Sequence, residues 1–335
     1  MSAAAPQAFA RLFRHGVRDR EVHPLRHLLQ RHRGFDGVLA AVPVAAATGT
    51  VHATAALDPA ALDRCVGALP PLPQALLALQ SALRRDAPVD EIVDRLGRDQ
   101  ALAARTLRLA NSAFYGVPGR VATLGDAVRV LGTRALASML STVAVNAAFA
   151  PPRCAGFDFG AFWRHALATA IAARAIARQR RGPDEELCFT AALLHDIGRL
   201  ALASCFGEPY ALALAEAQRL DRPAIEAERA VLGIAHDAVG AQVARHWRFP
   251  PAIAEVIATH HAPPLEGGAE LCDVVHVADV VAHGLQFAHS PAEGLPPLQL
   301  AAWHRLALPA ETWLAVFATV ESGVADACRA LGVQP

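Results

Sequence analysis

The feature that most constrains the fold is a helical spacing of apolar residues that continues from residue 74 almost to the end of the chain. Leu76, Leu79 and Leu83 form the first stripe, and apolar residues recur three and four positions apart after it. Strand patterns are almost absent, and proline or glycine pairs separate the segments. We expect helices over residues 133–149, 157–181, 208–220, 223–232, 236–248, 251–261, 269–288 and 310–331, with Gly132 as a stop and Asp184 as an N-cap. The main body is therefore predicted to be an all-α, multi-helix bundle.

Composition excludes several classes of protein. The chain has 335 residues, of which 53% are hydrophobic and 19% charged, so it is not a disordered chain. The formal net charge is zero, so we expect no nucleic-acid partner. There is no lysine in the sequence. Mechanisms that need a phosphate-binding P-loop lysine or a Schiff-base lysine are thereby excluded.

The cysteines and the apolar segments predict the compartment. Six cysteines are spread singly, with no C-x-x-C pair. They are Cys65, Cys154, Cys188, Cys205, Cys272 and Cys328. We expect them to be small buried side chains in a reducing cytosol rather than a disulfide scaffold. The beginning of the chain shows no secretory signal, and the uncharged stretch 37–57 is too interrupted for a membrane span, so a cytoplasmic protein is expected.

Residues 1–66 form an N-terminal extension whose fold the sequence does not assign. The stretch 11–33 carries seven Arg and four His. It is either a basic arm for an anionic partner or a solvated helical face. We favour the second interpretation, because Phe13 is the only aromatic residue among these basic side chains.

A histidine and carboxylate pattern on successive predicted helices carries the strongest chemical signal. The pair His195-Asp196 lies in an apolar helical segment, where an isolated buried Asp would be costly. The candidate ligands are His165, His195, Asp196, His236, His260, His261 and Asp279. Such ligands suit Fe, Mn or Zn, and two ions bridged by Asp196 would activate water.

Single histidines at helical positions more often serve packing than chemistry, and the chain has 15 of them. We interpret the histidines outside the pattern as surface or packing residues. Examples are His246, His276, His283, His289 and His304.

The order of these residues resembles the HD superfamily of metal-dependent phosphohydrolases, and the upstream half resembles the HDOD (HD-related output) domain more closely. The matching segments are Leu-Pro-Pro-Leu-Pro at 69–73, residues 92–99, Leu-Arg-Leu-Ala-Asn-Ser-Ala-Phe-Tyr-Gly at 107–116, residues 127–132 and 189–200, Trp-Arg-Phe-Pro at 247–250, and His260-His261. The resemblance covers about residues 69–265, with weaker matching to about 285. It divides the chain into an extension (1–66), an HDOD domain (67–265, with halves 67–150 and 157–265) and C-terminal helices (266–335).

One matching segment has a structural explanation of its own. Asn111 is suited to the left-handed position after a helix, with residues 113–115 packing the turn against the core. We favour this interpretation over ligand binding. The alternative is that the turn forms a surface facing a partner.

The chain departs from the related HD-GYP branch at three places. Ala161 stands where that branch has an acidic residue, so a third ion is not expected. No GYP segment follows His261. Arg199 stands where a lysine is expected; it keeps the positive charge but cannot act as a titrating acid.

The resemblance implies two functions from different classes. The favoured one is a regulatory module of bacterial signal transduction, with partners in two-component or cyclic-di-GMP networks. The alternative is a metal-dependent phosphohydrolase acting on a nucleotide or cyclic dinucleotide, with Asp196 and Arg199 as catalytic residues. A metal that only staples the fold is a third possibility. One or two divalent ions (Fe, Mn or Zn) are the cofactors that the pattern allows, a metal-free protein that engages a partner would favour the regulatory module, and no organic cofactor is expected.

Overall fold

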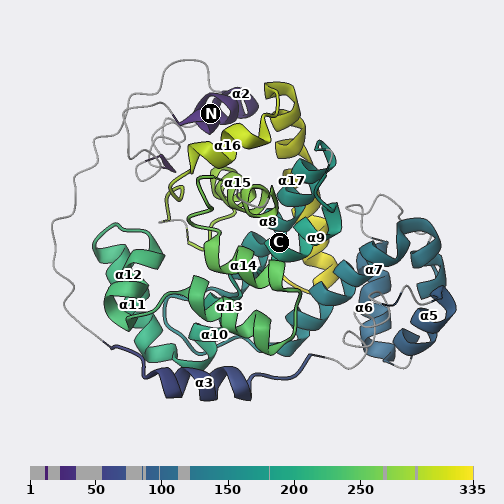
Figure 1. Cartoon of the computed structure of the whole chain (residues 1–335), viewed down its shortest axis with the longest axis horizontal. Coiled ribbons are helices and arrows are strands. Elements are labelled where there is room, and N and C mark those ends of the chain that lie inside the picture. Colours follow the sequence, from purple (N-terminus) through teal and green to yellow (C-terminus); the bar gives the residue numbers. More distant parts are fainter. Residues whose placement is uncertain are drawn as a thin grey trace.

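The computed structural model describes residues 12–13, 23–34, 55–72, 85, 88–97, 99–111, 121–180, 182–266, 270–290 and 293–334. Every regular element within these residues is a helix (Figure 1), which confirms the predicted all-α class. The helices are α2 (Pro24–Arg33), α3 (Pro59–Ala68), α5 (Val89–Gly97), α6 (Gln100–Ala110), α7 (Leu124–Ala148), α8 (Phe159–Arg178), α9 (Glu185–Leu194), α10 (Ile197–Cys205), α11 (Gly207–Arg219), α12 (Ala224–Leu232), α13 (His236–His246), α14 (Pro251–Thr259), α15 (Glu270–Gly284), α16 (Leu300–Leu306) and α17 (Ala310–Leu331).

Helix α8 is the centre of the larger part of the molecule. It packs against α9, α15 and α17, and most of its side chains are buried. Many of them are alanines, whose small side chains let three helices approach one central helix closely. Helices α5, α6 and α7 pack against one another at one edge of the molecule (Figure 1). The chain thus has a thick α8-centred body with a smaller helical group beside it.

The predicted helix signals place most of the boundaries. Asp184 caps α9 by accepting hydrogen bonds from the backbone N–H groups of Glu186 and Leu187. Gly132 has φ 85° and breaks the helical path, although α7 continues on both sides of it and begins earlier than predicted, at Leu124. Helix α16 was not predicted. The largest difference is that α9 ends at Leu194, so His195 and Asp196 lie in the junction before α10 rather than inside one helix.

Two glycines let α10 cross α13 at close range. A Cβ atom on Gly198 would lie 1.9 Å from the backbone oxygen of His236 and 2.6 Å from the nitrogen of Gly240. A Cβ on Gly240 would meet Ile257 at 2.8 Å. Since real Cβ contacts are never this short, both positions require glycine. This crossing brings the start of α13 next to the His195-Asp196 junction.

The N-terminal extension contributes two helices to the body. Leu25 and Leu29 of α2 are fully buried, and Leu29 packs against Gly284 of α15. On the outer side, His32 forms an ion pair with Glu321 of α17, at 2.8 Å. The described part of the basic stretch is therefore a helix with a buried apolar face and an exposed polar face. This agrees with the solvated-face interpretation.

The prediction that all six cysteines are unpaired is wrong for two of them. Cys65 of α3 and Cys205 at the end of α10 form a disulfide, with Cα atoms 6.1 Å apart. They are separated by 140 residues, and the sequence does not reveal that α3 packs beside this part of the body. The other four cysteines are free and buried, as predicted.

Asn111 closes a turn by a mechanism that differs from the predicted one. It does not adopt a left-handed conformation. Its side-chain amide instead accepts a hydrogen bond from the backbone N–H of Val121 at 3.1 Å and donates one to the Val121 oxygen at 2.6 Å. The structural role favoured for Asn111 therefore fits these contacts, while residues 112–116 of the same signature lie outside the described residues.

Two helical stretches of the described chain, Leu124–Ala148 and Glu185–Cys205, are long and apolar enough to cross a membrane. Their most apolar windows are 61% and 89% buried inside the protein, respectively. Core helices of globular proteins pass the same length and composition test, so this is weak evidence for a span.

Candidate metal centre

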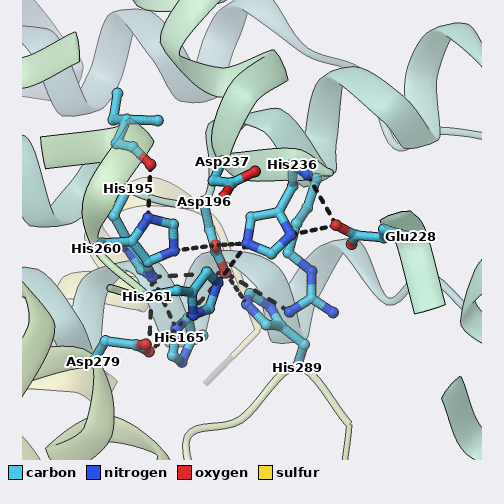
Figure 2. Close-up of polar contacts among 12 residues, drawn as sticks. His165, His195, Asp196, Glu228, His236, Asp237, His260, His261, Asp279 and His289 are labelled. Carbon is cyan, nitrogen blue, oxygen red and sulfur yellow. Dashed lines mark hydrogen bonds and ion pairs between the residues drawn. The ribbon is translucent and has the colours of Figure 1, made fainter. Parts of the chain in front are cut away.

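All seven predicted ligand residues meet in one buried cluster (Figure 2). They come from five places in the fold: α8, the α9–α10 junction, the first residue of α13, the end of α14, and α15. In that order they are His165, then His195 and Asp196, then His236, then His260 and His261, then Asp279. The cluster therefore depends on residues that are up to 114 positions apart (165 to 279) in the chain.

Asp196 divides the cluster into two sides, one at each carboxylate oxygen. Its Oδ1 atom lies 3.1 Å from Nε2 of His236 and 3.4 Å from Nε2 of His260. His261 joins this side, with its Nε2 atom 2.8 Å from Nε2 of His236. We call these three histidines the Oδ1 side.

The other oxygen of Asp196 faces the second group. Its Oδ2 atom lies 3.6 Å from Nε2 of His195 and 4.0 Å from Nε2 of His165. Asp279 closes this group, with Oδ1 3.1 Å from Nε2 of His165 and 3.8 Å from Nε2 of His195. We call His165, His195 and Asp279 the Oδ2 side.

Backbone carbonyl groups fix the orientation of three of the imidazoles. Nδ1 of His165 lies 2.8 Å from the oxygen of Phe287, and Nδ1 of His195 lies 2.6 Å from that of Ala192. Nδ1 of His260 lies 2.8 Å from the oxygen of Ile257. A carbonyl oxygen can only accept, so each Nδ1 carries the hydrogen. In the neutral ring the lone pair is then on Nε2, the atom directed into the cluster.

His236 is anchored by a charge instead. Glu228, which is fully buried, places Oε2 2.6 Å from Nδ1 of His236 and accepts the backbone N–H of the same residue at 2.9 Å. Burial would lower the pKa of His236, but the carboxylates of Glu228 and Asp196 outweigh it and raise this pKa to about 10.

The remaining pKa shifts describe a site with buried negative charge. Burial would raise the pKa values of Asp196 and Asp279, but the surrounding histidines hold both well below the ordinary range. Burial lowers the pKa of His195 to about 4, so that ring is neutral. Two ionised carboxylates thus face the imidazoles of the cluster in a buried interior.

This donor set fits a divalent metal ion. Among the described residues, Oδ1 of Asp196, Oδ1 of Asp279 and Nε2 of His260 are buried and make no hydrogen bond of good geometry, although Nε2 of His236 and Nε2 of His165 lie 3.1 Å from the two oxygens. Unpartnered polar atoms of this kind are costly, and a cation that they share removes the cost. Imidazole nitrogens backed by carbonyl or carboxylate partners, together with carboxylate oxygens, are ligands that suit Zn, Fe and Mn.

Two histidines interpreted as surface or packing residues belong to this cluster, so that interpretation is wrong for them. Nε2 of His289 lies 2.5 Å from Oδ2 of Asp196, and Nε2 of His283 lies 3.4 Å from Oδ1 of Asp279. His283 is four residues after Asp279 on one helix face, a spacing that could have revealed it. His289 follows the end of α15 and carries no such signal. The interpretation fits the exposed His246 and His304 and the buried His276.

Arg199 is held inside the protein by a chain of polar groups. Its Nε donates to the Tyr210 hydroxyl at 3.2 Å, and that hydroxyl donates to Oε1 of Glu228 at 3.2 Å. The NH2 nitrogen donates to Oε1 of Glu293 at 2.8 Å, and NH1 lies 3.7 Å from Asp196. Sequence reasoning missed Tyr210, Glu228 and Glu293, because nothing local marks them.

A cavity of about 600 Å³ reaches the cluster. Asp196, Arg199 and His236 line it, and its wall also carries Arg222 and Arg229 together with Asp221, Glu226 and Asp237. This volume is in the range of small-molecule sites. The cluster is therefore accessible to a ligand from one direction.

An all-α body with a buried His and Asp cluster, built around an His-Asp pair between two helices, defines a protein of the HD-related class. The model of the family described as HDOD domain matches residues 69–263. The chain belongs to the HDOD domain family.

Comparisons with individual proteins agree. An HDOD domain protein of Geobacter sulfurreducens is 25% identical, with a TM-score of 0.67, covering 81% of this chain and 95% of the other. A Shewanella amazonensis protein, named provisionally as a phosphohydrolase, is 28% identical with a TM-score of 0.58, covering 82% and 92%. An uncharacterised Treponema pallidum protein is 27% identical over 202 residues, which cover 58% of this chain and only 38% of that protein's length.

Proposed function

We propose that this chain is a regulatory HDOD protein of bacterial signal transduction, located in the cytoplasm, whose cluster binds one or two divalent metal ions. One observation carries the metal assignment: anchored imidazoles direct their Nε2 atoms at two buried, ionised carboxylates. Nε2 lone pairs and carboxylate oxygens are all acceptors, so a cation that they share stabilises the group.

The two oxygens of Asp196 suggest how two ions would be shared. His165, His195, Asp196 and Asp279 would hold the first ion. Asp196, His236, His260 and His261 would hold the second. A bridging position for Asp196 is supported by the division of its contacts, because each oxygen faces a different set of imidazoles.

The regulatory function is supported by the state of Arg199. This cation is the one group of the predicted pattern that would meet a phosphate, and its guanidinium is occupied by Glu293 and Tyr210. A protein of a two-component or cyclic-di-GMP network is the proposed partner. Binding of such a partner, rather than turnover, would be the output.

The second candidate is a metal-dependent phosphohydrolase acting on a nucleotide-like substrate. The cavity that reaches Asp196 and Arg199 favours it, as does the name of the Shewanella relative. Metal ions bound here would supply Lewis acidity and an activated water. Arg199, once free of Glu293, would neutralise charge on a phosphoryl oxygen.

Metal analysis of protein purified without chelators tests the metal assignment. We expect one or two equivalents of Fe, Mn or Zn in the wild type and a large loss in Asp196→Asn, with His304→Ala, an exposed position, as the matched control. Wild-type protein without metal, and with no change of melting temperature when any of the three ions is added, would contradict the assignment.

The same samples separate the functions. Turnover of phosphodiesters by metal-loaded protein that is lost in Asp196→Asn would favour the hydrolase. Metal content without turnover, together with capture of a signalling partner, would favour regulation. If Asp196→Asn loses its metal but not its stability, the ion does not staple the fold.

A further inference from the structure

The chain that follows α15 lies against the Oδ2 side of the cluster and holds part of it in place. The backbone oxygen of Phe287 accepts the Nδ1 hydrogen of His165, at 2.8 Å. Two residues later, the His289 ring stacks against Phe162, with centroids 5.8 Å apart and planes inclined by 20°. His289 is only 8% exposed, and its ring centroid lies 4.2 Å from that of His165. The His289 side chain is thus fixed beside the predicted ligands.

His289 points at the same oxygen that the Oδ2 side surrounds. Its Nε2 atom lies 2.5 Å from Oδ2 of Asp196, nearer than Nε2 of His195 or His165. Nδ1 of His289 is buried without a hydrogen-bond partner among the described residues. Ligand atoms of His289, His165 and Asp196 all lie within 4.8 Å of one another, close enough to share one ion.

Glu293 makes a second contact from the same stretch of chain. Its Oε1 atom accepts from NH2 of Arg199 at 2.8 Å, and its Oε2 atom accepts the backbone N–H of His289 at 3.2 Å. A carboxylate on a guanidinium uses the same donors that a phosphate would use. A phosphate ligand that used the NH2 donor of Arg199 would therefore have to displace Glu293.

We propose that His289 is an additional metal ligand on the Oδ2 side and that Glu293 occupies the anion position of Arg199. His289 and Glu293 then form an internal cap, in which His289 strengthens metal binding and Glu293 weakens the binding of phosphate and phosphate esters. This inference rests on the proposed metal binding. It explains how the centre keeps all seven predicted ligands while Arg199 is paired with Glu293 instead of with an external anion.

Metal titration tests the ligand assignment without measuring activity. The apo protein is titrated with Zn²⁺ in competition with a chromophoric chelator, as wild type, His289→Gln, His236→Gln and His304→Gln. We expect His289→Gln to bind at least one of its ions roughly 10-fold or more weakly, as His236→Gln does, and His304→Gln to bind as wild type. With Co²⁺ as the probe, His289→Gln should also change the visible absorption spectrum, because a nitrogen ligand is lost.

The outcomes separate this inference from the proposed function. Weaker binding in His236→Gln with unchanged affinity and spectrum in His289→Gln would overturn the ligand role and leave the metal centre intact. Wild-type protein that binds neither ion would overturn both. Circular dichroism of each variant shows that an effect on affinity is not a failure to fold.

Phosphate binding tests the role of Glu293. Inorganic phosphate is titrated into metal-loaded wild type, Glu293→Gln, and the control Glu208→Gln, whose side chain is exposed on α11. We expect phosphate to bind Glu293→Gln roughly 10-fold or more tightly than wild type, because about 1.4 kcal/mol of competition by the carboxylate is removed. Equal phosphate affinity in wild type and Glu293→Gln would overturn the anion part of the proposal.

Discussion

The two sides of the cluster share Asp196 but are built differently. The Oδ1 side comes from α13 and the end of α14, and it is supported by buried Glu228 and by the glycine crossing of α10 and α13. The Oδ2 side comes from α8, the α9–α10 junction and α15, and the chain after α15 adds the contacts of Phe287 and His289. The comparison teaches that a motif on regular helices can be recognised from sequence, whereas the part completed by irregular chain cannot.

The largest loss of stability is expected from breaking the disulfide that joins α3 to the end of α10. Helix α10 crosses α13, which carries His236 of the Oδ1 side. The bond closes a loop of about 140 residues, so Cys205→Ser or a reductant should lower the free energy of unfolding by about 4 kcal/mol. Thermal melting with and without dithiothreitol measures this. Cys65→Ser is the control, since it should not respond to reductant.

The same experiment bears on the compartment. Disulfides are rare in reducing cytosol, so thiol counting on protein taken directly from cells tests the proposed location. Six free thiols in the unreduced, denatured protein would show that this bond is absent under those conditions.

The next largest loss of stability is expected from a substitution at the glycine crossing of α10 and α13. Gly198→Ala places a Cβ atom 1.9 Å from the backbone oxygen of His236, so α13 must move. We expect a loss of about 3 kcal/mol of stability and weaker metal binding, seen by chemical denaturation and metal titration. Gly67→Ala in α3 is the matched control. Its Cβ has nothing within 4 Å, so stability should stay equal or rise slightly.

A substitution of Glu228 tests the carboxylate contact that anchors His236, a residue of the Oδ1 side. Glu228→Gln keeps the shape but removes the charge that faces Nδ1 of His236. We expect a loss of about 2 kcal/mol of stability and one of two ions bound more weakly. Glu216→Gln on α11, paired with Arg219, serves as control. Equal weakening of both ions would show that the two sides do not act separately.

The smallest loss of stability is expected in α7, which contributes no residue to either side of the cluster. Thr123 and Asp126 form a capping box at the start of α7. Thr123→Ala should cost about 1 kcal/mol in thermal unfolding. Metal affinity should not change, and a changed affinity would mean that α7 is coupled to the cluster.

The fold was largely predictable because the residues that begin and end its helices act through their own local backbone. Asp184 and Gly132 mark a cap and a break with their own backbone chemistry, and the structure uses both. The spacing could not show that α9 ends before His195, since the interruption is set by the packing of α10 against α13. In the N-terminal extension, the helical character of α2 was expected as a solvated face, whereas α3 was not predicted.

The cluster was predictable as far as its residues follow the family order. His165 and Asp279 are 114 positions apart (165 to 279), and the order of His and Asp residues on successive predicted helices, together with the resemblance, linked them before the structure placed them 3.1 Å apart. His289, Glu228 and Glu293 have no local signature, because their roles depend on how distant segments meet. The Cys65–Cys205 pair was missed for the same reason.

A chain of hydrogen bonds links the Oδ1 side to the cap beside the Oδ2 side. It runs from Glu228 through Tyr210 and Arg199 to Glu293. It ends at His236 in one direction and at the backbone of His289 in the other. An anion that replaces Glu293 would therefore alter the surroundings of both. By thermodynamic linkage, whatever factor such an anion applies to metal affinity, the metal must apply to the affinity for the anion. The occupancy of the centre would then depend jointly on the concentration of the metal ion and on that of the anion.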